Sequence, residues 1–179
     1  MSFRAERPAF SAETRHESSR LGFIHARNQM LLCSQGEMSY AHVRAFIDAG
    51  AEFHRTRMYE EENEGEYIYE EDARSPEFIE RRKEFRIWRD ASFAMNGEES
   101  IVHAIKLLSR EQAKARRDLK EAQSAGRLAE IHFAPSNGSS YKATIYRREM
   151  EIRGYTRAMK VVAQVSIMEK GLIEEQGSV

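Results

Sequence analysis

The stretch from Leu108 to Tyr146 constrains the fold most, because a highly charged helical pattern passes directly into turn and alternating sequences. Ser109 and Gln112 have the spacing of a capping box, which predicts that a new helix begins at Arg110. Gly126 is able to end that helix in the left-handed conformation. The apolar residues at helical spacing are Ala115, Leu119 and Ala122. The segment is therefore predicted to be a short, charged helix that stops at a glycine.

Two short apolar runs follow the glycine, and their pattern favours strands. The first, RLAEIHFA, alternates imperfectly, and PSNGSS is composed of turn-forming residues. In the second, YKATIYRREMEI, one face would carry Tyr141, Ala143 and Ile145. The other face would carry Lys142, Thr144 and Tyr146. This alternation across a turn predicts a β-hairpin.

The N-terminal region has the pattern of two antiparallel helices. Ser11 is a capping residue for a helix from about Ala12, and CSQGEMS, with Gly36, is expected to end it. Ser39 caps a second helix. Its predicted buried face consists of Val43, Phe46, Ile47, Gly50 and Phe53.

A run of acidic residues between Glu60 and Asp72 marks a change of character and predicts a connector. Ser75-Pro76-Glu77 follows, with a cap, a proline at the first helical position and an acid in the first turn. The apolar seam of this helix is Phe78, Phe85, Trp88 and Met95, and Asn96-Gly97 ends it. EESIVHAIKLL is expected to form a separate short helix.

The C-terminal region leaves two structures open. A helical stripe is formed by Ala158, Val161, Val162, Val165, Met168 and Leu172. KVVAQVSI is also rich in β-branched residues, which favour strands. The segment 156–173 is therefore either helix or strand.

The order helix, short helix, tight turn, basic helix, glycine and hairpin resembles the winged helix-turn-helix family, over about Ser75 to Ile152. Leu119 and Ala122 stand seven and four positions before Gly126, as apolar residues do in the recognition helix of that family. The resemblance implies a mainly α fold with a small β-hairpin. It divides the chain into an N-terminal helical hairpin with an acidic connector, 1–72, and a winged-helix-like unit with a C-terminal helix, 73–179.

The resemblance implies a DNA-binding protein, either a transcriptional regulator or an architectural or replication accessory factor, which acts as a homodimer. A helix fits the major groove, where Gln112, Arg116 and Arg117 would face bases. The phosphate contacts would come from Lys114, Lys120, Lys142, Arg147 and Arg148. The net charge of the chain is −1, so such a surface requires local segregation of charge. Glu111, Asp118 and Glu121 share the basic helix, so a solvated face with internal ion pairs is the alternative.

An enzyme, a cofactor site and a metal site are not predicted. The chain lacks the phosphate-binding, nucleophile-elbow and zinc-protease motifs, and Glu13–His16 is a lone Glu-x-x-His. Glu99 and His103 are read as an ordinary side-chain pair. Cys33 is the only cysteine and is expected to be a buried small residue in a reducing compartment. With no secretion signal and no long apolar run, we expect a cytoplasmic protein without membrane contact.

A non-enzymatic α-helical adaptor or assembly protein is the alternative to DNA binding. The long charged helices, the seam that contains Trp88, and eight methionines suited to adaptable contacts favour a protein partner.

Overall fold

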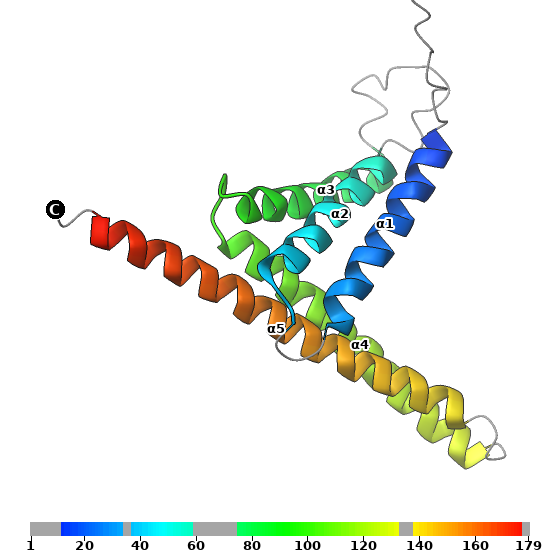
Figure 1. The fold of residues 1–179 in the computed structure, drawn as a ribbon. Coiled ribbons are helices and arrows are strands. Elements are labelled where there is room, and N and C mark those ends of the chain that lie inside the picture. Colours follow the sequence, from blue (N-terminus) through cyan, green and yellow to red (C-terminus); the bar gives the residue numbers. More distant parts are fainter. Residues whose placement is uncertain (1–11, 34–36, 59–74, 133–137, 177–179) are drawn as a thin grey trace, which may run out of the picture.

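The computed structural model describes residues 12–33, 37–58, 75–132 and 138–176, and within these ranges every regular element is a helix (Figure 1). The five helices are α1 (Ala12–Leu32), α2 (Tyr40–Met58), α3 (Pro76–Met95), α4 (Val102–His132) and α5 (Gly138–Gln176). The predicted acidic connector between Glu60 and Asp72 lies outside the described residues.

The predicted β-hairpin is wrong, and with it the winged-helix-like unit and the mixed fold class. The first expected strand belongs to the end of α4 as far as His132, and the whole of the second, Tyr141 to Ile152, is helical in α5. Tyr141 and Ile145 alternate, but they are also four residues apart and continue to Ile152 at helical spacing. A short apolar run of this kind satisfies both periods, and packing against α4 selects the helix.

The predicted break at Ser109 and the predicted end at Gly126 are also wrong, because α4 runs without interruption through both. Leu107 and Leu108 are buried on the same helix as Ala115, so one apolar stripe continues through the supposed cap. Gly126 lies inside the helix, where an added Cβ would stand 3.3 Å from the Cβ of Tyr141. The glycine permits close approach of α5 and does not terminate α4.

The predicted positions of the first three helices are confirmed, whereas the predicted cap Ser11 and the predicted helix end at Gly36 lie outside the described residues. The backbone N–H of Phe78 donates to the Ser75 hydroxyl at 3.1 Å, and Asn96 caps the other end of α3. The N–H of His42 donates to the hydroxyl of Ser39 before α2. The expected buried face of α2 holds at Val43, Phe46, Ile47 and Gly50, whereas Phe53 is half-buried. Cys33 is half-buried rather than buried, and its thiol donates to the Gln29 carbonyl at 2.9 Å.

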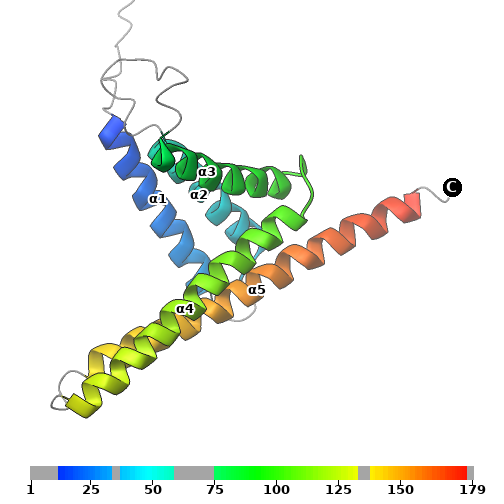
Figure 2. The ribbon, with the colours of Figure 1, turned by 180° about the vertical axis from the view of Figure 1, so that it is seen from behind.

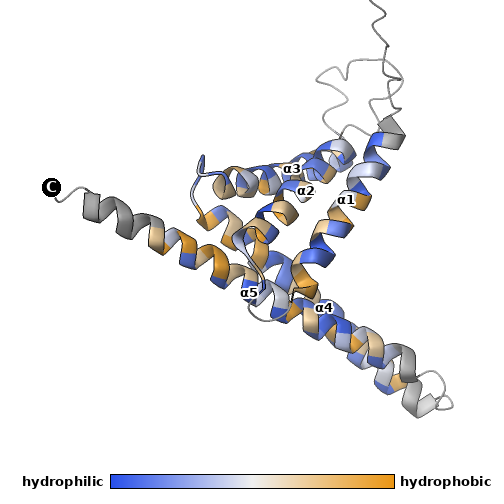
Figure 3. Ribbon diagram, viewed as in Figure 1, coloured by the Kyte–Doolittle hydropathy of each residue, from blue (hydrophilic) through white to orange (hydrophobic). Residues whose placement is uncertain are grey.

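One apolar core is shared by all five helices. Its largest fully buried side chains include Trp88, Tyr155 and Phe46, from α3, α5 and α2. Trp88 meets Phe46 edge to face, with ring centroids 5.4 Å apart. In Figure 3 hydrophobic residues gather where the helices meet. None of the described helices has the length and apolar character needed to cross a bilayer.

The α4–α5 hairpin, residues 102–132 and 138–176, gives the molecule its shape. The two helices lie side by side and antiparallel, and their joined ends project well beyond α1, α2 and α3 (Figures 1 and 2). We call α1, α2 and α3 the body. The segment 156–173 is helical, which decides the alternative that its sequence leaves open. The C-terminal half of α5 extends past the body on the other side (Figure 1).

Candidate nucleic-acid interface

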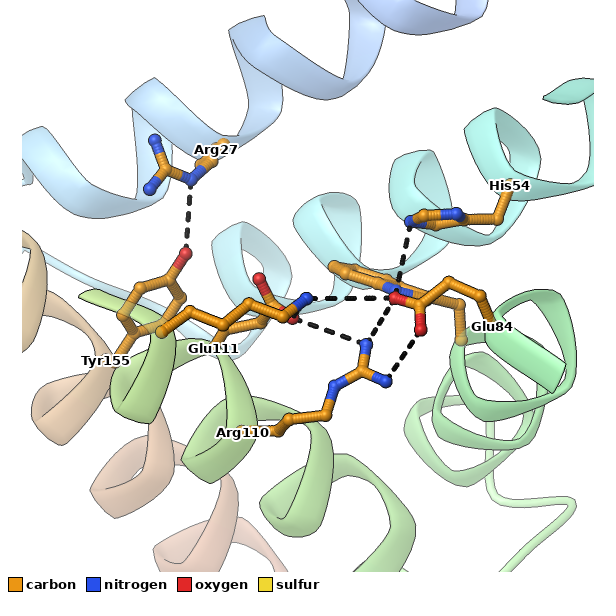
Figure 4. A network of polar contacts seen from close by, with 8 residues as sticks. Arg27, His54, Glu84, Arg110, Glu111 and Tyr155 are labelled. Carbon is orange, nitrogen blue, oxygen red and sulfur yellow. Dashed lines mark hydrogen bonds and ion pairs between the residues drawn. The ribbon is translucent and has the colours of Figure 1, made fainter. Parts of the chain in front are cut away.

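A carboxylate on α3 fixes the position of α4 relative to the body (Figure 4). Arg110 of α4 donates to Glu84 through both terminal nitrogens, at 2.8 Å to Oε2 and 2.5 Å to Oε1. The indole N–H of Trp88 donates to the same carboxylate at 3.1 Å. Lys114 ion-pairs with Glu111 at 2.7 Å and stands 3.8 Å from Glu84. Bidentate guanidinium–carboxylate pairs of this kind fix orientation as well as adding energy.

The electrostatics of this network keep Glu84 ionised and His54 neutral. Burial alone would raise the pKa of Glu84, but the hydrogen bonds and charge of Arg110, with Trp88 and Lys114, hold it below its usual value. Burial lowers the pKa of His54 to about 4, against the opposing attraction of Glu84. His54 Nε2 lies 3.9 Å from Glu84 Oε1, and the imidazole stacks on Trp88.

A second polar contact joins α5 to α1. Arg27 Nε donates to the Tyr155 hydroxyl at 3.1 Å, and its terminal nitrogen lies 3.3 Å from Glu151 Oε2. Burial raises the pKa of Tyr155 to about 12, although Arg27 opposes that shift. Both helices of the hairpin are thus held to the body through charged pairs.

An open cleft of about 470 Å³ lies over the first network, at the junction of α1, α2, α3 and α4. Four rings line it, from Phe23, Phe53, His54 and Trp88. The three carboxylates of the cleft each have a cationic partner: Glu80 pairs with Lys83, Glu84 with Arg110, and Glu111 with Lys114. The pair of Glu84 with Arg110 joins α3 to α4, so this junction acts as a structural connection between the body and α4.

Three of the predicted DNA-binding residues make contacts with other residues of the protein. Gln112 donates to the Thr156 hydroxyl at 2.7 Å and to the Ile152 carbonyl at 3.3 Å. Lys114 belongs to the cleft network. Arg148 pairs with Glu151 at 2.7 Å and with Asp118 at 3.2 Å. Lys114 and Arg148 therefore follow the alternative in which charges pair within the protein, and Gln112 is held by uncharged hydrogen bonds to α5.

The other five predicted residues are exposed. They are Arg116, Arg117 and Lys120 on α4, and Lys142 and Arg147 on α5. None of the five has an ion pair with another residue in the described parts of the chain.

Helical geometry gathers three of these exposed cations on one side of the hairpin. Each follows a residue of the inner stripes, where α4 and α5 pack: Arg116 follows Ala115, Lys120 follows Leu119, and Lys142 follows Tyr141. One residue is about 100° of rotation. Because the two helices run in opposite directions, this rotation turns both stripes toward the same side.

The same position is occupied by three further exposed cations. Arg127 follows Gly126, Arg153 follows Ile152, and Lys160 follows Met159. We name as the basic face Arg116, Lys120, Arg127, Lys142, Arg153 and Lys160. Within the described residues, these six have no ion-pair partner, and Glu149 is the carboxylate that lies on the same side. Arg117 lies on the outer edge, and Arg147 lies on the other side of α5 by the same geometry.

The body attaches to the opposite side of the hairpin. Lys114, which meets Glu84 of α3, precedes the inner residue Ala115 by one position. Glu151, which meets Arg27 of α1, precedes Ile152 by one position. The basic face is therefore directed away from α1 and α3.

The sequence prediction does not include Arg127, Arg153 and Lys160. Arg127 lies in the first predicted strand, Lys160 lies in the segment that the sequence leaves between helix and strand, and Arg153 lies between the predicted hairpin and that segment. The signal was present in the spacing. Arg116, Lys120 and Arg127 stand at i, i+4 and i+11, and Lys142, Tyr146 and Arg153 repeat that spacing. It identifies a face only once both segments are recognised as helices.

No family model, no curated protein and no solved structure matches this chain. Within the described residues, no group of three or more histidine, cysteine, aspartate or glutamate side chains is arranged to hold a metal ion.

Proposed function

We propose that the protein binds DNA through the basic face of the α4–α5 hairpin, as a non-enzymatic architectural or accessory factor. The observation that carries the proposal is the segregation of charge. Six exposed cations share one side of a helix pair, while the chain as a whole has a net charge of −1. A stripe of Lys and Arg on one face is the electrostatic footprint of a polyanion-binding surface.

The energetic basis of the proposal is release of counterions from phosphates. Each neutralised phosphate of duplex DNA contributes about −0.9 to the slope of log K against log salt. Six contacts therefore predict a slope of about −5. Among the described residues the cations of the basic face have no ion-pair partner to give up on binding, whereas Lys114 and Arg148 would lose theirs.

The first prediction concerns neutralisation of the basic face. The triple variant Arg116→Gln, Lys120→Gln and Arg153→Gln removes three of the six charges, so we expect the salt slope to fall to about −3 and the affinity for DNA to fall at every salt concentration. The measurement is fluorescence anisotropy of a labelled DNA at several salt concentrations, with the full-length chain.

The matched control removes the same number of charges from the body. Arg82→Gln, Lys83→Gln and Arg86→Gln change three exposed cations of α3. This control is expected to retain the slope of the unmodified protein. Equal losses in the two triple variants, or binding that ignores salt, would contradict a role for the basic face.

A second candidate function, self-association, is favoured by the exposed apolar residues of α5. Ile167 is 71% exposed and Met168 is 69% exposed, on the part of the helix that extends past the body. Two-fold pairing of this half with a second copy would cover them. Light scattering tests the idea: Ile167→Glu with Met168→Glu should convert a dimer to a monomer, and a monomeric unmodified protein would exclude it.

A further inference from the structure

We infer that the basic face docks across the sugar-phosphate backbone of a DNA duplex, without entering the major groove, and therefore binds independently of base sequence. This inference rests on the proposed function and specifies which form of DNA is bound and how. It replaces the insertion of a single helix into the groove that the winged-helix resemblance implies.

The basic face is too wide to enter the major groove. The cations of the basic face come from two helices that lie side by side, with Gly126 against Tyr141. Packed helices have axes about 8–10 Å apart, and each is about 10 Å across, so the pair is roughly 18–20 Å wide. The major groove is about 12 Å wide and admits one helix. Both rows of cations reach DNA together only from outside the groove.

The length and stiffness of the surface favour a duplex. From Lys142 to Lys160 the basic face runs along one continuous helix, which at 1.5 Å per residue spans about 27 Å. That length corresponds to roughly eight phosphate steps of one strand of a duplex at 3.4 Å each. Duplex DNA is straight over such a distance, since its persistence length is about 150 base pairs. A straight row of cations therefore meets a straight polyanion without bending either one.

The chemistry of the surface disfavours single strands and base reading. Proteins that bind single strands stack successive bases on several aromatic side chains. Among the described residues of this side, the aromatic is Tyr146, which is 65% exposed. Gln112, the amide expected to read bases, is occupied by Thr156 and the Ile152 carbonyl. What the surface presents to a ligand is mainly positive charge.

The experiment compares three labelled ligands with the full-length protein at two salt concentrations. Two are duplexes of about 16 base pairs, twice the expected footprint, with unrelated sequences of equal composition. The third is one strand of the first duplex. We expect the two duplexes to bind with dissociation constants within a few-fold of each other, and the single strand to bind about tenfold more weakly with a shallower salt slope.

The outcomes separate this inference from the proposed function. Preference for one duplex by about a thousandfold would indicate base reading, and tighter binding of the single strand would indicate stacking. Either result overturns the inference while DNA binding stands. Absence of binding to all three ligands overturns both.

Two single variants on α5 test which side of the helix contacts DNA, even where the affinities are modest. Lys142 lies on the basic face, and Arg147, five residues later, lies on the other side of the helix. Lys142→Gln should weaken both duplexes by the same factor and reduce the salt slope by about 1, whereas Arg147→Gln should change neither. A loss confined to one duplex, or an equal effect of Arg147→Gln, contradicts docking by this face.

Discussion

Trp88 of α3 packs directly against Gly50 of α2. Trp88 is 1% exposed, and its six-membered ring lies directly over the glycine. A Cβ at Gly50 would stand 2.9 Å from Cη2 of that ring and would overlap Cζ3 and Cε3. The indole also holds Glu84 through its N–H, so its position affects the network that anchors α4.

Gly50→Ala is therefore expected to be strongly destabilising. The ring has no free direction in a closely packed core, so we predict a loss of about 3 kcal/mol in the free energy of unfolding, measured by urea denaturation. Gly22→Ala is the matched control, since an added Cβ at that position of α1 has nothing within 4 Å. It should stabilise by about 0.5–1 kcal/mol. Similar stabilities for the two variants would show that Trp88 is not seated as described.

His54 predicts a dependence of stability on pH. Its folded-state pKa of about 4 lies below the ordinary value of 6.5, so the unfolded chain binds the proton first as pH falls. The contribution of neutral His54 to the free energy of unfolding is fully present above pH 6.5 and is lost as pH falls toward 4. Between pH 7.5 and pH 5 this group accounts for a loss of about 2 kcal/mol.

His54→Phe keeps a ring against Trp88 and removes the titration. Urea denaturation at the two pH values should show a loss of stability on acidification smaller by about 2 kcal/mol than in the unmodified protein. His103→Gln, at an exposed position of α4, should behave as the unmodified protein does. An unchanged pH dependence in His54→Phe would contradict burial of a neutral histidine.

At the scale of elements, the sequence predicts α2 and α3 because their ends carry local signals. Ser39, Ser75 and Asn96-Gly97 specify start and stop positions through side-chain and backbone hydrogen bonds. The sequence does not predict the full extent of α4 and α5. Gly126 indicates a helix end and the alternation from Tyr141 indicates a strand, but packing between α4 and α5 overrides both local signals. That contact joins residues that are distant in sequence within the hairpin, and no local pattern reports it.

Ala143→Val tests the helical state of the segment that sequence favoured as a strand. Ala143 is exposed, so packing contributes little. In a helix the substitution should cost about 0.5 kcal/mol of unfolding free energy, whereas in a strand it should stabilise. Ala113→Val, at an exposed position of α4, should give the same sign as Ala143→Val. Stabilisation by Ala143→Val alone would return the segment to a strand.

At the scale of the whole molecule, two polar contacts join the α4–α5 hairpin to the body, and the basic face lies on the opposite side of the hairpin. Glu84 holds α4 and Arg27 holds α5, both on the side opposite the basic face. Sequence identified Arg116, Lys120 and Lys142 because they are basic, but it also chose Gln112, Lys114 and Arg148. Only the packing of α4 against α5 and α3 shows that Arg148 pairs with Asp118 across the hairpin, that Gln112 donates to Thr156, and that Lys114 lies beside Glu84.

Lysine footprinting by acetylation and mass spectrometry, with and without duplex DNA, locates the DNA-binding surface on the folded protein. Lys120, Lys142 and Lys160 lie on the basic face, and Lys83 lies on the body as an internal reference. Binding at the basic face should protect the first three lysines and leave the reactivity of Lys83 unchanged. Protection of Lys83 equal to that of the other three, or no protection of the three under conditions where the duplex is bound, would contradict it.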